Sequence, residues 1–268
     1  MRTVIAVGLL AVMLFPLYWM VDASLQTNQQ IADRSPHWLP LPGTLDGYRD
    51  ALAQQGGHLA VSLMVALGTV VLTLLIAAPA AYGLSRSGTP GSRPLLFTLL
   101  IVQLIPGIVM ANALYRVFAV LGVLNSPEAL VLADSTLAVP FAVLIMRAFM
   151  LSVPRELIEA AGLDGAGALR TFATIVLPVS RNGVVTAGLF AFLFSWGDFM
   201  FASTLNLGAP QWTPITVGLY DFIGAGTNTT SWNSVMATGV LASLPVAVLL
   251  VVAQRHVSAG LAAGGVKD

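Results

Sequence analysis

Apolar stretches long enough to cross a lipid bilayer recur along the whole of this 268-residue chain. A transmembrane helix needs about 20 consecutive, mostly apolar residues. Only 9% of the residues are charged, whereas about 25% is usual in soluble domains. The sequence therefore predicts an all-α integral membrane protein with a single transmembrane domain over residues 1–268. We expect six transmembrane helices, the third kinked at Pro106, over residues of about 4–24, 58–84, 95–121, 129–150, 183–205 and 233–254.

The first apolar stretch, residues 4–21, follows Arg2 and could also be the apolar part of a signal peptide. That part of a signal peptide has about 7–15 residues, which is shorter than this stretch. Aromatic residues at its far end, in the sequence YWMV, are typical of a membrane interface. We therefore expect a retained span, followed by an external segment at residues 25–57. The prolines and glycines of that segment argue against a long helix there.

The distribution of basic residues predicts the orientation, because cytoplasmic loops of membrane proteins are enriched in lysine and arginine. With both termini in the cytoplasm, only three of the twelve basic residues lie on the outer side, namely Arg34, Arg49 and Arg116. The others lie on the cytoplasmic side or at its edge: Arg2, Arg86, Arg93, Arg147, Arg155, Arg170, Arg181, Arg255 and Lys267.

Several kinds of active site are excluded by what the sequence lacks. A P-loop needs a lysine on the nucleotide phosphates, but the single lysine is Lys267, and no GxxxxGK pattern surrounds it. Cysteine is absent, which excludes disulfides and thiolate metal sites. The three histidines, His37, His58 and His256, are far apart, and a formal net charge of zero gives no indication of nucleic-acid binding. We expect a chain that is not an enzyme and that itself binds no metal or cofactor.

Polar residues inside the predicted spans are candidates for a solute path, because they are costly in a bilayer. Trp196 and Asp198 together could stack on a sugar ring and bind its hydroxyl groups, although an interfacial role for Asp198 is about as well supported. Asp134 and Arg147 are better explained as interfacial residues near the ends of the fourth span, Arg147 by snorkelling. The candidates for the path are Gln103, Asn112, Trp196 and Asp198, and packing between helices explains the first two equally well.

Residues 151–182 form a polar segment between the fourth and fifth spans, on the predicted cytoplasmic side. Pro154 suits the first turn of a helix, and the glutamates that follow it interact favourably with the helix dipole. Gly165 can adopt a positive φ, so the chain can turn there into a second helix from about Ala166. A face of mostly small side chains on the first helix would comprise Leu157, Ala160, Ala161 and Leu163.

Residues 159–178 fit the pattern EAA-x3-G-x9-I-x-LP at every fixed position. This pattern resembles the signature of the membrane subunits of bacterial ATP-binding-cassette (ABC) importers. Other stretches, such as WLPLPGTLDGYRDAL, QLIPGIV and QRHVSAGLAAGGVKD, resemble the same family in the same order along nearly the whole chain. Phe172 and the sequence DGA are similar to the carbohydrate-uptake branch, the maltose-type inner-membrane permeases. The resemblance assigns coupling with an ATPase to Glu159, Ala160, Ala161, Asp164, Gly165, Ala166, Phe172, Ile175, Leu177 and Pro178.

The resemblance implies the ABC type I importer permease architecture in the bacterial inner (plasma) membrane, in contact with lipid. The implied partners are a second permease subunit in a heterodimer, two ABC ATPase subunits that bind ATP and Mg, and an extracytoplasmic sugar-binding protein. Asn182 replaces a frequent proline, and Gly197 and Asp198 replace asparagine and glutamate, which leaves sugar contacts at Asp198 open.

Two alternatives to a sugar permease remain at this point. One is an ABC permease for another solute, such as a glycerol phosphate or an oligopeptide. A phosphate ester would need cations in the path, and no predicted span centre carries a lysine or an arginine. The other is an autonomous secondary transporter or channel, for which no clear internal repeat is evident.

Overall fold

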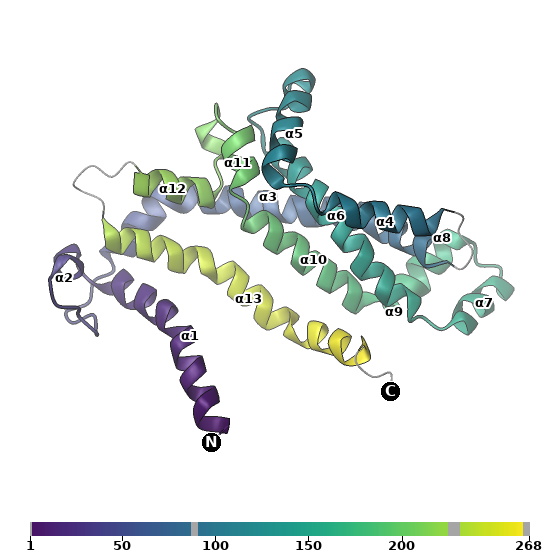
Figure 1. Ribbon diagram of the computed structural model, residues 1–268, viewed down its shortest axis with the longest axis horizontal. Helices are drawn as coiled ribbons and strands as arrows, with labels where there is room; N and C mark the ends of the chain where they lie inside the picture. The colour runs from purple at the N-terminus through teal and green to yellow at the C-terminus, as the bar shows by residue number, and fades with distance from the viewer. Residues whose placement is uncertain (1, 87–90, 225–230, 265–268) are drawn as a thin grey trace. The chain divides into compact units, whose positions relative to one another are not determined.

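The computed structural model describes residues 2–86, 91–224 and 231–264, with side chains for residues 3–86, 91–224 and 231–254. All the regular structure in these ranges is helical, which agrees with the predicted all-α class (Figure 1). Lys267, the side chain of Arg255 and residues 87–90 of the loop before the third span lie outside the described part.

Helices long and apolar enough to cross a membrane are α1 (Arg2–Leu25), α3 (Asp46–Ser85), α6 (Pro127–Leu151) and α13 (Trp232–Gly264). Two further pairs of helices pass the same criteria together but are strongly bent. Helix α4 (Ser92–Val102) meets α5 (Gly107–Leu121) at 99°, with the predicted kink at Pro106 between them. The helical residues Ala168–Val179 meet α10 (Arg181–Trp196) at 79°. If each bent pair is one span, the number of spans is six.

The prediction that residues 25–57 contain no long helix is wrong for the second half of that segment. Helix α3 begins at Asp46, after the last proline of the segment at Pro42, and the glycines that follow do not stop it. One of them, Gly47, lies against the backbone of Asn233 in α13. A Cβ atom at position 47 would come within 2.9 Å of the carbonyl carbon and oxygen of Asn233. Close contact between the two helices therefore requires glycine there.

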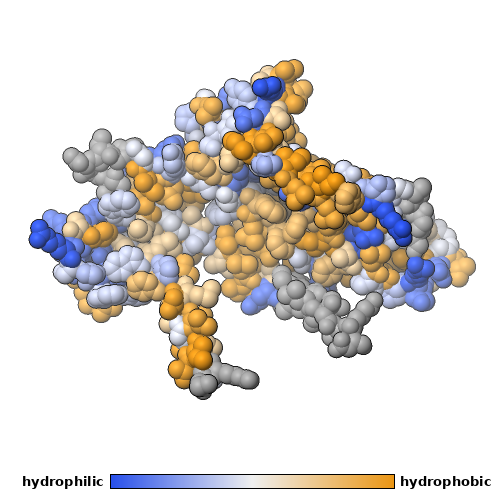
Figure 2. Space-filling model, viewed as in Figure 1, coloured by the Kyte–Doolittle hydropathy of each residue, from blue (hydrophilic) through white to orange (hydrophobic). Residues whose placement is uncertain are grey.

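The described chain forms two compact units, and the first contains residues 1–60 and 213–247. Its helices are α1, α2 (Asn28–Ala32), the start of α3, α12 (Ile215–Gly224) and the first part of α13. Asn28 joins α2 to α13, because its side chain donates to Ser231 Oγ at 2.9 Å and accepts from the N–H of Asn233 at 3.2 Å. The most apolar part of α1 is not buried by any described residue, and Figure 2 shows apolar side chains along it.

The second unit contains residues 61–212 and 248–268. Small residues let its long helices approach closely: Gly183 of α10 faces Phe149 of α6, and Gly68 of α3 faces Val131 of α6. The buried core includes Ala77, Ala81, Val143, Met146, Val176 and Ala187. The short elements are α7 (Arg155–Leu163), α8 (Ala168–Thr171), the π-helical turn η1 (Phe172–Val176), α9 (Leu177–Val179), α11 (Met200–Leu205) and the 3-10 turn η2 (Pro210–Trp212).

Candidate functional site

The segment predicted to couple with an ATPase forms a helix, a tight turn and a second helix after the end of α6. Pro154 precedes α7 with φ −55°, and α7 ends at a turn in which Gly165 has φ +77°. The N–H groups of Gly165 and Ala166 donate to the carbonyl oxygens of Gly162 and Ala161, which is the Schellman arrangement of a helix C-terminus. The predicted positive φ at Gly165 is confirmed, and the second helix, α8, begins two residues later than predicted.

The inner side of this segment packs on the core of the second unit. The ring of Phe172 lies 5.2 Å from the ring of Tyr82 on α3. The N–H of Leu177 donates to the carbonyl oxygen of Phe172, five residues back, and Pro178 has no N–H with which to continue the regular α-helical pattern. Val176 belongs to this core, and Ile158 and Leu177 also pack against it. A continuous apolar contact therefore fixes the segment to α3 and α6.

The outer side of the segment carries apolar side chains that the described residues leave uncovered. Leu163 is 91% exposed and Leu169 is 79% exposed. The predicted face of small side chains is divided, because Ala161 is buried and the others are exposed. Leu169 is not among the candidates that the sequence identified. The one signal for it is that it is an apolar residue in a polar stretch. The exposed signature residues are Glu159, Ala160, Asp164, Gly165 and Pro178, and the half-buried ones are Ala166, Phe172, Ile175 and Leu177.

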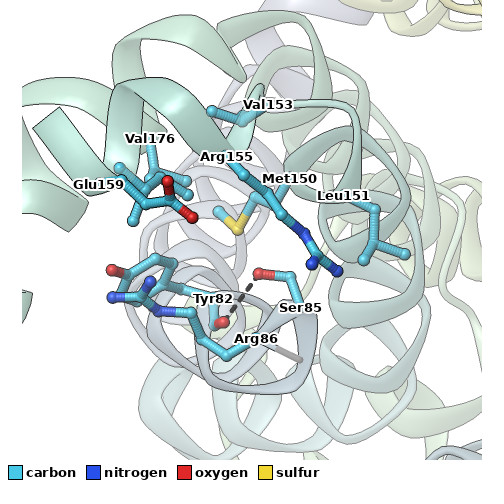
Figure 3. A pocket seen from close by; sticks show the side chains of 10 residues that line it. Tyr82, Ser85, Arg86, Met150, Leu151, Val153, Arg155, Glu159 and Val176 are labelled. Carbon is cyan, nitrogen blue, oxygen red and sulfur yellow. Dashed lines mark hydrogen bonds between the residues drawn. The ribbon is translucent and has the colours of Figure 1, made fainter. Parts of the chain in front are cut away.

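A cleft of about 460 Å³ lies where α7 meets the C-terminal ends of α3 and α6. Its charged lining residues are Arg86, Arg155 and Glu159, and we call it the arginine cleft. Figure 3 shows Arg155 reaching from α7 toward α3, and Arg86 beside the ring of Tyr82. The guanidinium carbon of Arg86 lies 4.8 Å from the centre of that ring, which is a cation–π contact. No sequence pattern brings these residues together, because they come from segments far apart in the chain.

Asp198 and Trp196 are close in sequence, but their side chains contact different parts of the second unit. Helix α10 ends at Trp196, so the predicted span at residues 183–205 is interrupted before α11. The carboxyl oxygens of Asp198 accept hydrogen bonds from the N–H groups of Phe201 at 3.1 Å and Ala202 at 2.9 Å, so Asp198 caps α11. Trp196 is 8% exposed and stacks on Phe192 with ring centres 5.4 Å apart. In this conformation the pair presents no open sugar platform.

Asp134 is buried between helices of the second unit. It is 4% exposed and accepts a hydrogen bond of 2.5 Å from Ser195 Oγ of α10. The hydroxyl of Thr69 of α3 donates in turn to Ser195 Oγ at 3.3 Å. This chain of polar groups joins α3, α6 and α10 inside the second unit, because each group finds its hydrogen-bond partner on another helix. Arg147 donates from Nε to the carbonyl oxygen of Leu84 at 3.0 Å.

Of the two remaining path candidates, Gln103 lies in the break between α4 and α5, and Asn112 lies on α5. Gln103 donates to the carbonyl oxygen of Leu137 of α6 at 3.3 Å, as a residue that joins helices would. Asn112 is exposed on α5 and donates to the carbonyl oxygen of Ile108 at 2.9 Å. The four predicted path residues therefore have separate local partners. Among the described residues, no group of three histidine, aspartate or glutamate side chains could hold a metal ion.

The described chain combines apolar helices long enough to cross a membrane with an exposed helix–turn–helix that packs on α3 and α6. Comparison with known proteins identifies the family. A family described as "Binding-protein-dependent transport system inner membrane component" matches residues 73–262. The chain belongs to this family. It is thus a permease subunit of a binding-protein-dependent importer, a non-enzymatic class whose ATPase is a separate subunit.

Two relatives and one solved structure show the extent of the similarity. The chain is 34% identical over 270 residues to the sulfoquinovosyl glycerol transport system permease protein SmoH of Agrobacterium fabrum, with 100% of this chain and 93% of the relative covered. It is 30% identical to the diacetylchitobiose uptake system permease protein DasC of Streptomyces coelicolor, with 98% and 95% covered. A chain of a bacterial ABC transporter involved in alginate import has the same fold, with a TM-score of 0.81, 20% identity, and 95% and 94% covered.

Proposed function

We propose that this chain is a permease subunit of an ATP-driven sugar importer and forms part of its translocation path. The names of SmoH and DasC, which concern a sugar glycoside and an oligosaccharide, support a saccharide as the solute. The proposed complex contains a second, different permease subunit, two ABC ATPase subunits that bind ATP and Mg, and an extracytoplasmic sugar-binding protein. Family membership removes the alternative of an autonomous secondary transporter.

In the proposed orientation both termini are cytoplasmic and the chain crosses the inner membrane several times. The basic residues of the sequence support this orientation through the positive-inside rule. The external segment at residues 25–57 then faces the sugar-binding protein, and residues 151–182 face the ATPase. The proposed spans are residues of about 4–24, 58–84, 95–121, 129–150, 183–205 and 233–254. The third is broken at Pro106 and the fifth after Trp196.

The observation that carries the coupling role is the two-sided character of α7 and α8. On the inner side, Phe172 and Val176 fix the segment to α3 and α6. On the outer side, Leu163 and Leu169 are exposed at a tight turn, as apolar anchors for a groove on another protein would be. A movement of the ATPase would therefore displace α3 and α6 through a packed contact. The signature residues of the segment take part in this coupling.

A substrate-uptake experiment tests the sugar assignment. The gene is deleted in its host, and uptake of radiolabelled oligosaccharides and of glycerol 3-phosphate is measured with and without the wild-type chain restored. We expect loss of uptake of one class of saccharide, recovery on restoration, and unchanged uptake of glycerol 3-phosphate. Loss of glycerol 3-phosphate uptake alone would assign the permease to phosphate esters instead.

A further inference from the structure

The arginine cleft contains none of the solute-path candidates, and Glu159 is the one residue that it shares with those assigned to coupling. Tyr82 and Ser85 come from the last turn of α3, Arg86 follows that helix directly, and Met150 and Leu151 come from the last turn of α6. Both helices are apolar and long enough to span a bilayer, and their C-terminal ends meet at this cleft. With the cytoplasmic ends of both helices placed at the edge of the hydrocarbon core, the cleft would lie near the level of the lipid headgroups.

We propose that the arginine cleft binds an anionic phospholipid whose phosphodiester headgroup carries hydroxyl groups, of the phosphatidylglycerol type. Arg86 and Arg155 together carry two positive charges and Glu159 carries one negative charge, so the lining has a net charge of +1. That charge matches the single negative charge of a phosphodiester. Guanidinium groups bind phosphate oxygens well, and basic pockets between transmembrane helices bind anionic headgroups.

Glu159 and the apolar lining decide which phosphate-bearing ligand fits. A carboxylate repels a bare phosphate but accepts hydrogen bonds from the hydroxyl groups of a glycerol headgroup. Met150 and Leu151 offer an apolar wall for the lipid glycerol and the first acyl carbons, which a free phosphate would leave unused. Pro154 provides no side-chain cap for the first turn of α7, where an anion is stabilised by the helix dipole.

A lipid in this cleft would join α7 to the ends of α3 and α6. It would therefore stiffen the contact through which the coupling segment moves the spans. The inference uses the placement of these helices in a membrane and does not depend on the solute. A lipid-binding measurement on the purified chain, without ATPase or sugar, therefore tests it separately from the proposed function.

The experiment compares four probes on the full chain purified in a neutral detergent. Didecanoyl phosphatidylglycerol, didecanoyl phosphatidylcholine, didecanoyl phosphatidylethanolamine and glycerol 1-phosphate are titrated, and binding is followed by native mass spectrometry and by the rise in Tm. We expect phosphatidylglycerol to bind most tightly. Arg86→Gln and Arg155→Gln should each weaken it about fivefold, whereas Arg116→Gln, a change of an exposed arginine on α5, should leave it unchanged.

Controls separate a lost site from a disturbed fold. Arg86→Lys keeps the positive charge but loses the planar contact with Tyr82. Because the charge attracts the phosphodiester, this variant should retain most of the phosphatidylglycerol affinity. Unchanged binding in the Arg86→Gln, Arg155→Gln double variant would overturn the proposal. Equal affinity for phosphatidylcholine would do the same, and equally tight binding of glycerol 1-phosphate would assign the cleft to a soluble phosphate rather than to lipid.

Discussion

Ser195 holds together three helices of the second unit through two hydrogen bonds. Its hydroxyl donates to Asp134 of α6 and accepts from Thr69 of α3, and all three residues are buried. Ser195→Ala leaves both partners without this bond, so we expect a loss of about 1–3 kcal/mol in the free energy of unfolding. Asp134→Ala should have a similar cost, because it removes the acceptor to which the Ser195 hydroxyl donates.

The double variant distinguishes a network from two independent sites. Because both single changes remove the same hydrogen bond, the combined loss should be smaller than the sum by about 0.5 kcal/mol or more. Unfolding of the purified chain in detergent, followed by circular dichroism, measures these values. Ser203→Ala is the matched control, since that hydroxyl donates only to the nearby carbonyl oxygen of Met200. Additive losses would contradict the network.

Two glycines in the second unit should respond to alanine in opposite directions. A Cβ atom at Gly183 would lie 2.7 Å from Cβ of Phe149, so Gly183→Ala should overpack the contact of α10 with α6 and cost about 1–3 kcal/mol. Gly162 is inside α7 with nothing within 4 Å of its Cβ position. Gly162→Ala should therefore stabilise the chain by about 0.5–1 kcal/mol. Thermal unfolding compares the two variants, and equal effects would argue against the close α6–α10 contact.

At the scale of the element, the shape of the coupling segment depends on Gly165. Its φ of +77° is strained for any β-branched residue. Gly165→Val should therefore distort the turn between α7 and α8, at a cost of about 1–2 kcal/mol, and uncouple transport from ATP hydrolysis. Gly162→Ala, in the same helix, should leave coupling intact. The ratio of sugar uptake to ATP hydrolysis in the reconstituted complex is the measurement, and wild-type coupling in Gly165→Val would show that the turn is a passive connection.

The exposed leucines of the same segment should contribute to docking and not to folding. Leu163→Gln combined with Leu169→Gln changes side chains that are 91% and 79% exposed, so the Tm of the isolated chain should move little. Attachment of the ATPase should weaken about tenfold or more, as on loss of apolar anchors, and Glu159→Arg should weaken it too by reversing a charge in α7. Copurification of the ATPase with tagged permease measures this. Leu207→Gln, an exposed leucine outside the segment, is the control, and retention of the ATPase in the double variant would count against the docking role.

At the scale of the whole molecule, the absence of cysteine makes the proposed topology directly testable. Gln29 and Arg93 are both exposed and lie on opposite sides of the membrane in the proposed orientation. A single cysteine at position 29 should react with an impermeant thiol reagent in intact cells. A cysteine at position 93 should react only after the cells are opened. Labelling of position 93 from outside would invalidate the proposed orientation.

Local patterns of the sequence were sufficient for several features of this protein. The apolar stretches determined the helical class, since a bilayer requires the backbone to bond within each helix. Pro106 determined the break between α4 and α5, because proline lacks the N–H that a helix needs. Gly165 determined the turn of the coupling segment, because a positive φ is favourable only for glycine. Each of these depends on residues that are neighbours in the chain.

Features that depend on distant partners were decided only by the tertiary structure. Asp134 and Asp198 look alike in sequence, but one bonds to Ser195 of another helix and the other caps α11. The early part of α3 packs so closely on α13 at Gly47 that a Cβ atom there would clash with Asn233. The arginine cleft exists because the ends of α3, α6 and α7 converge. Pattern and propensity describe one helix at a time, whereas these sites arise from side chains that different helices bring within a few ångströms of each other.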